Sequence, residues 1–185
     1  DWRFAFASAM KDEDPRLPEA IETWKNSFSA LPRSLATYEK LLDQILGQTQ
    51  EGVTSHLLIT AALEQTANLQ RELLPDNAVS CIQKLTEFRR GADFKCTPYH
   101  SNLLTVCILN AYDVLPSEGD GVSFNLREKA LQKAVSFSGA SKTPELYDGV
   151  ISRWEALLGT VDVSQQIEAC KSMALRTNDA VSKML

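Results

Sequence analysis

The stretch that decides the fold is LLTVCILNAY, Leu103–Tyr112, in which eight of the ten residues are apolar. A helix with one face in water carries a regular share of polar residues, whereas a helix that is apolar all round is enclosed by its neighbours. The stretch is too short to cross a bilayer, which needs about 20 consecutive apolar residues. We therefore expect it to form a buried helix at the centre of the fold.

A strand is the alternative for this stretch, because Val106 and Ile108 are β-branched. The flanking residues favour a helix. Thr97 suits an N-cap, and Pro98 suits the first helical position, where the missing N–H costs nothing. Pro116 ends the pattern. The sequence thus predicts a central helix over about residues 98–114.

The rest of the chain also has helical periodicity, and proline or glycine separates most of its segments. The predicted fold class is all-α, with about nine helices in a bundle or a short superhelical stack around the central helix. The expected helices cover about 2–10, 18–31, 33–46, 54–74, 77–90, 98–114, 125–138, 144–158 and 163–185.

A length of 185 residues predicts a single helical domain over residues 1–185, large enough to fold without a metal or disulfide. Residues 1–16 are a candidate hinged N-terminal helix and linker, because the charged sequence KDEDPRLP follows the first helix. We expect that helix to bury a stripe that comprises Trp2, Ala5, Phe6, Ala9 and Met10. The chain starts without Met and ends inside a helical pattern, so we expect a segment of a longer protein.

The net charge of −5 argues against broad nucleic-acid binding, which depends on many Lys and Arg contacts to phosphates. No stretch resembles a membrane span or a signal peptide. The four cysteines lack C-x-x-C spacing and the chain has no N-x-[ST] acceptor, which favours a cytoplasmic location. The alternative is a secreted protein in which the cysteines are paired.

The last predicted helix carries an apolar stripe at alternating three- and four-residue spacing, as in the a and d positions of a coiled coil. The stripe consists of Ile167, Cys170, Ala174, Thr177, Val181 and Met184. It covers fewer than three heptads, which is too few to identify a coiled coil. One interpretation is packing within the chain, and the other is packing against a helix of a partner chain.

The sequence offers little catalytic chemistry. It has two histidines, His56 and His100, and a metal site needs several converging ligands, so we predict no metal or other cofactor. Cys96 and His100 are the one candidate nucleophile and base, because Cys96 lies beside Lys95 and near a helix N-terminus. No oxyanion hole or orienting carboxylate accompanies them, and we expect His100 on the surface. We therefore predict a protein that is not an enzyme.

Arg89, Arg90 and Lys95 form the one local basic cluster. Their simplest role is to complement a helix dipole and keep the surface soluble. The alternative is contact with an acidic partner or a lipid headgroup. The three tryptophans lie on apolar stripes, where core packing and an aromatic-lined cavity are the two interpretations.

The absence of a recognisable catalytic motif favours a non-enzymatic protein–protein interaction or scaffold module. Its partner would be another protein or a second copy of the chain. The candidate partner-binding residues are Arg89, Arg90, Lys95, Thr177 and Val181. The alternative function is a carrier of an apolar ligand or lipid in a helical cavity, secreted in that case.

Overall fold

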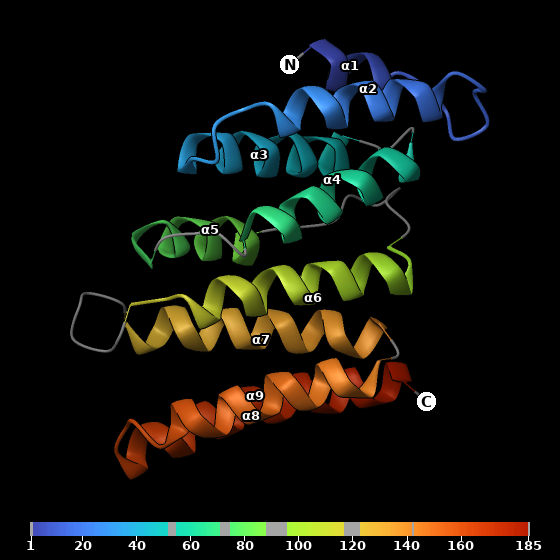
Figure 1. Cartoon of the computed structure of the whole chain (residues 1–185). Coiled ribbons are helices and arrows are strands. Elements are labelled where there is room, and N and C mark those ends of the chain that lie inside the picture. Colours follow the sequence, from blue (N-terminus) through green and yellow to red (C-terminus); the bar gives the residue numbers. More distant parts are fainter. Residues whose placement is uncertain are drawn as a thin grey trace. The chain divides into compact units, whose positions relative to one another are not determined.

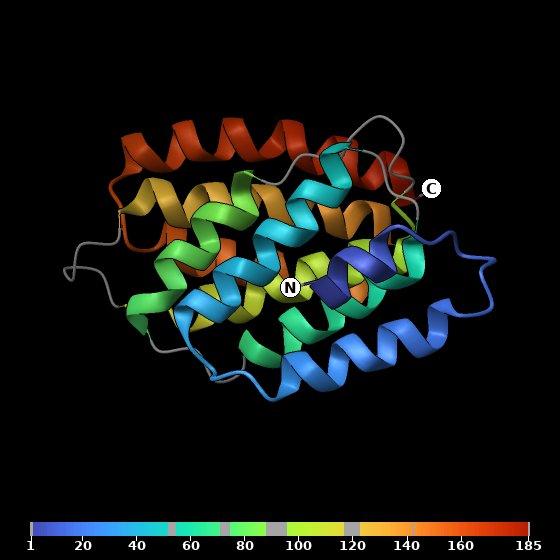
Figure 2. The same ribbon diagram turned by 90° about the horizontal axis from the view of Figure 1, so that it is seen from above.

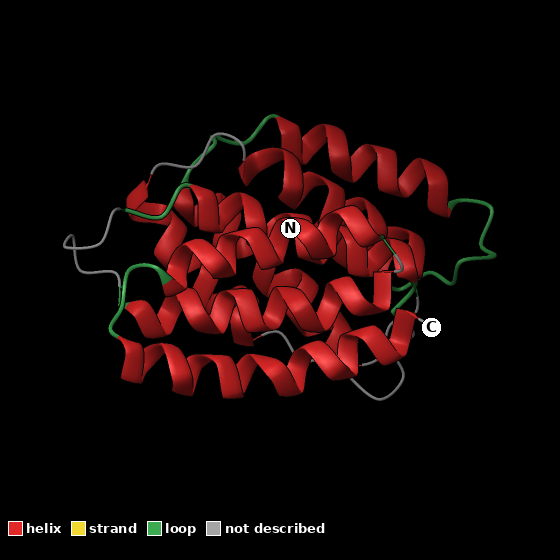
Figure 3. Ribbon diagram, turned by 90° about the horizontal axis from the view of Figure 1, so that it is seen from below, coloured by secondary structure: helices red, strands yellow, loops and turns green. Residues whose placement is uncertain are grey.

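The computed structural model describes residues 2–51, 55–70, 75–87, 96–116, 123–141 and 143–184. Within these ranges the side chains at 48–51, 69–70, 75–76, 140–141 and 179–184 lie outside the description. The described part of the chain forms nine helices and no strand, which confirms the all-α prediction (Figures 1 and 3).

The helices divide into two compact units, with α1–α4 in the first and α5–α9 in the second. The first unit contains α1 (Trp2–Ser8), α2 (Leu17–Ser29), α3 (Leu35–Glu51) and α4 (His56–Gln70). The second contains α5 (Pro75–Glu87), α6 (Pro98–Asp113), α7 (Phe124–Ser141), α8 (Pro144–Leu158) and α9 (Val163–Met184). The single domain over residues 1–185 stays a prediction.

Aromatic packing holds α1 on α2 in the first unit. Trp24 of α2 is fully buried, and its ring lies 5.5 Å from that of Phe4 and 5.6 Å from that of Phe28. The stripe predicted for the first helix is therefore wrong at four of its five positions, because Phe4 and Ala7 point inward, and only Met10 is buried as predicted. Trp2 and Phe6 are 67% and 51% exposed.

The carboxylate of Asp12, in the linker after α1, binds the start of α4 through hydrogen bonds. Asp12 accepts hydrogen bonds from the Ser55 hydroxyl at 3.1 Å and from the backbone N–H groups of His56 and Leu57 at 3.2 and 3.1 Å. The first N–H groups of a helix have no partner within the helix, so this contact supplies one. The hydrogen bonds of Asp12 and the packing of Phe4 argue against a free hinge over residues 1–16. The hinge itself stays a prediction.

Replacing Asp12 with alanine is expected to lower the free energy of unfolding by about 1–2 kcal/mol, the usual cost of removing a helix cap. Urea denaturation followed by circular dichroism measures the change. Glu13→Ala is the matched control, because it removes the same charge from an exposed neighbouring position. Equal losses in the two variants would show that charge, not the α4 cap, is responsible.

In the second unit, α6 and α7 form the interior. The predicted central helix is confirmed, since α6 starts at Pro98 after the Thr97 N-cap and buries most of its circumference. Its fully buried side chains include Leu104, Cys107 and Ile108. α7 packs beside it and contacts α5, α6, α8 and α9 (Figure 1).

Small side chains allow these helices to approach closely. Ala130 and Ala134 of α7 and Ala111 of α6 are completely buried. At the edge of this core, Arg153 of α8 binds Asp113 at the end of α6 through two hydrogen bonds of 2.7 and 2.6 Å. This pairing raises the pKa of Arg153 and ties α8 to α6.

Candidate interaction surfaces

The C-terminal helix presents an apolar surface that no described residue covers. α9 begins after Asp162, whose carboxylate accepts the N–H of Gln165 at 2.9 Å. It lies beside α7 (Figure 2), which it contacts. Ala169 and Met173 are both 3% exposed, so they form its buried face.

The first three residues of the stripe predicted on α9 lie outside that buried face. Ile167 is 50% exposed, and Cys170 and Ala174 are also exposed. Val163, one turn before Ile167, is 69% exposed and extends the same stripe. Packing within the described chain therefore does not account for the three- and four-residue spacing from Val163 to Ala174.

Two of the exposed charges on α9 pair with each other. Lys171 donates to Glu168 at 2.8 Å, and both side chains are largely exposed. An exposed pair of this kind contributes little to stability. Leu175, which is 75% exposed, adds a further apolar side chain to the outer side of α9.

The other predicted partner-binding residues are only partly described. Thr177 continues the stripe and is half-buried on α9. The backbone of Val181 is helical, whereas its side chain lies outside the described residues. Arg89, Arg90 and Lys95 also lie outside them, so the proposed basic cluster stays a prediction.

The hydrogen bonds described for Cys96 and His100 lead to other residues. His100 is 2% exposed, so its predicted surface position is wrong. The ring Nδ1 of His100 accepts the backbone N–H of Thr97 at 3.3 Å, and the backbone N–H of His100 donates to the Thr97 hydroxyl at 3.2 Å. The ring thus takes the place that Glu or Gln usually has in a capping box. Cys96 Sγ instead lies 3.3 Å from the hydroxyl of Ser101.

The four cysteines form no disulfide and differ in exposure. Cys170 is exposed and Cys96 is half-buried. Cys81 and Cys107 are completely buried, and burial raises the pKa of the Cys107 thiol. Because the thiolate is the reactive form, burial and a raised pKa both slow alkylation.

Iodoacetamide is therefore expected to label the native protein in a fixed order. Cys170 should react first, Cys96 should react more slowly, and Cys81 and Cys107 should react only after unfolding. Peptide mass spectrometry over a time course in buffer and in urea measures this order. Labelling of Cys107 in buffer as fast as that of Cys170 would contradict the buried position of α6.

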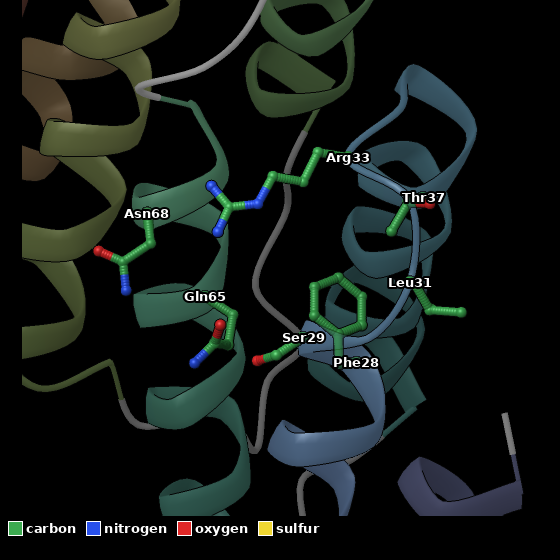
Figure 4. Close-up of a pocket in the computed structure, with 7 residues that line it drawn as sticks. All are labelled: Phe28, Ser29, Leu31, Arg33, Thr37, Gln65 and Asn68. Carbon is green, nitrogen blue, oxygen red and sulfur yellow. The ribbon is translucent and has the colours of Figure 1, made fainter.

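The first unit contains a small pocket where α2, α3 and α4 meet (Figure 4). Phe28 and Ser29 come from the end of α2, Leu31 and Arg33 from the link to α3, and Thr37 from α3. Gln65 and Asn68, on α4, complete the wall. Its volume of about 50 Å³ is far below the roughly 300–1,000 Å³ of pockets that enclose a whole small molecule.

The described residues contain no group of three or more His, Cys, Asp or Glu side chains that could hold a metal ion. Among the same residues, no helix combines the length and the apolar character that a membrane span requires.

By fold class, the molecule is an all-α protein of two helical units with an exposed apolar surface on its last helix. No protein-family model, curated protein or solved structure matches the chain, so any functional argument rests on its own residues.

Proposed function

We propose that this chain is a non-enzymatic interaction module that binds another protein through α9. The observation that carries the proposal is the exposed apolar stripe of Val163, Ile167, Cys170 and Ala174, which lies beside and not on the face that packs against α7. Contiguous exposed apolar surface is a frequent mark of a protein-binding site.

The spacing of the stripe indicates the kind of partner. Apolar residues that alternate at three and four positions fit the side of a second helix, where they pack as knobs into holes. We therefore propose that the partner contributes an amphipathic helix. A second copy of this chain is one such partner, and a different protein is the other.

Replacing Ile167 with aspartate tests the proposal, since a charge in the middle of the stripe must be desolvated when the partner binds. The expected result is at least a tenfold loss of partner binding. Sedimentation equilibrium measures self-association, and quantitative capture with the folded chain as bait measures binding of other proteins.

Gln165→Asp is the matched control. Gln165 is exposed on the same helix and two residues from Ile167, so its side chain points to a different side of the helix. Both variants add one negative charge, and circular dichroism establishes that both keep the fold. Equal binding by Ile167→Asp and the unmodified chain would overturn the proposal, as would equal losses in the two variants.

The carrier of an apolar ligand gains no support from the pocket in the first unit, because that pocket is small and partly polar. A cytoplasmic location stays a prediction.

A further inference from the structure

The exposed stripe on α9 changes in side-chain size along its length. Val163 and Ile167, in its first half, are large and branched, whereas Cys170 and Ala174, in its second half, are small. All four side chains are exposed. The spacing of four, three and four residues between them is the same when it is read in either direction. A second copy of the stripe that lies antiparallel to the first therefore meets it position for position.

Antiparallel pairing places large side chains opposite small ones. A twofold axis that passes between positions 168 and 169 sets Val163 opposite Ala174 of a second copy, and Ile167 opposite Cys170. Alternation of large and small side chains across facing positions fills an interface evenly. Parallel pairing in register sets Ile167 opposite Ile167 and Ala174 opposite Ala174, so the helices are held apart at one end and leave a gap at the other. The sizes thus favour the antiparallel contact.

The charges within the stripe are also self-complementary. Glu168 and Lys171 are the two charged residues between Val163 and Ala174. About the same twofold axis, Lys171 of one copy lies within one helical turn of Glu168 of the other, measured along the helix axis. Parallel pairing in register would instead bring the two Glu168 carboxylates together. Exposed pairs add little affinity, but like charges in contact disfavour a wrong alignment, so the charges select the antiparallel one.

The packing of α9 on its own unit leaves this side of the helix accessible. Ala169 and Met173 are 3% exposed and form the buried face, and α9 lies beside α7 (Figure 2). At 3.6 residues per turn, the stripe is centred about 110° around the helix from that buried face. A second helix can therefore pack on the stripe while α9 keeps its contact with α7.

We propose that the partner of α9 is α9 of a second copy of this chain, bound antiparallel about a twofold axis to form a homodimer. The inference rests on the proposed function, because it names the partner of the same surface. A contact in which each copy presents the same patch is closed once two chains have met. The expected assembly is therefore a dimer that does not extend into larger species.

The first test is sedimentation equilibrium of the full chain at concentrations up to about 1 mM, because a contact of this small size is expected to be weak. The expected result is an equilibrium between monomer and dimer. Ile167→Asp is expected to weaken the dimer at least tenfold. Leu175→Asp is the matched control, because Leu175 is 75% exposed but lies about 100° around the helix from Ala174. It is expected to leave the dimer unchanged, and circular dichroism checks that both variants are folded.

Three results would overturn the homodimer: a chain that is monomeric throughout, species larger than a dimer, or equal losses in the two variants. A dimer that Ile167→Asp does not weaken would also overturn it. The proposed function can survive the first of these results. A monomeric chain that binds a different protein, and loses that binding in Ile167→Asp, contradicts the homodimer and leaves α9 as the binding surface.

Cysteine cross-linking tests the direction of the helices. Val163→Cys and Ala174→Cys are made separately, each in a chain whose Cys96 and Cys170 are changed to alanine. Diamide accepts two electrons and two protons from a pair of thiols, which become a disulfide. A mixture of the two variants is expected to form a disulfide between positions 163 and 174. Antiparallel helices hold the two 163 positions about 16 Å apart along the axis, whereas a disulfide requires Cα atoms within about 7 Å. Cross-linking of either variant alone as fast as that of the mixture would overturn the antiparallel arrangement.

The native thiol of Cys170 provides an independent measurement. Cys170 lies in the proposed contact, and Cys96, which is half-buried, lies before α6. Iodoacetamide is expected to label Cys170 more slowly as the chain concentration rises through the range in which the dimer forms, while the rate for Cys96 stays constant. In dilute solution Cys170 still reacts first. A rate for Cys170 that does not change while the chain dimerises would place the dimer contact elsewhere.

Discussion

Replacing Trp24 with alanine is expected to lower the free energy of unfolding by about 4 kcal/mol, within the range for truncation of a buried aromatic side chain. The indole is completely buried and packs between the rings of Phe4 and Phe28. Its removal leaves a cavity between α1 and α2 that rigid helices fill only in part. Urea denaturation followed by circular dichroism measures the loss.

Trp24→Phe separates packing from hydrogen bonding at the same position. The indole Nε1–H of Trp24 is buried and has no hydrogen-bond partner among the described residues. A buried donor without a partner costs about 1–3 kcal/mol, and phenylalanine removes that cost while it keeps much of the ring contact. We expect Trp24→Phe to lose less than half as much stability as Trp24→Ala.

Trp2→Ala is the matched control, because it removes the same side chain from a position that is 67% exposed. Its expected effect is below about 0.5 kcal/mol, as for most surface substitutions. A loss as large as that of Trp24→Ala would mean that α1 buries the stripe predicted from the sequence and not Phe4.

Local signals made the helices predictable. Thr97 and Pro98 start α6 where the sequence indicated, and Thr97 accepts the predicted type of capping hydrogen bond. Gly159 follows the last residue of α8, and α9 starts at Val163 as expected. Caps and breakers act over a few residues, so they can be recognised without knowledge of the tertiary fold.

The choice of buried face was less predictable. In α1, aromatic residues at positions 2, 4 and 6 allow two overlapping stripes, and contact with Trp24 selects the one that contains Phe4. In α9 the more regular stripe is exposed, while Ala169 and Met173 pack inward. In both helices a neighbour distant in sequence decides the face, and periodicity alone contains no information about that neighbour.

The pocket residues were also beyond sequence reasoning. Phe28 and Arg33 lie 32 to 40 positions from Gln65 and Asn68 in the sequence, and no motif connects them. Glutamine and asparagine on a helix normally face water, so neither residue type signals a site. Only the packing of α2 and α3 against α4 brings them together.

Replacing Ile108 with alanine is expected to lower the free energy of unfolding by about 3 kcal/mol, because Ile108 is completely buried on α6. Leu103→Ala is the control on the same helix, and its expected loss is smaller because Leu103 is half-buried. Urea denaturation measures both, and equal losses would contradict the orientation of α6.

The same variant tests the predicted single domain when two tryptophans serve as separate reporters. Trp154 belongs to α8 in the second unit and Trp24 to α2 in the first. Chains that keep only one of these tryptophans, with the others changed to phenylalanine, report each unit by fluorescence. If residues 1–185 unfold as one cooperative domain, Ile108→Ala shifts both transitions equally. If the units unfold separately, Ile108→Ala shifts the transition reported by Trp154 and leaves the transition reported by Trp24 in place. The stability of the pocket in the first unit is then independent of α9, which carries the exposed stripe.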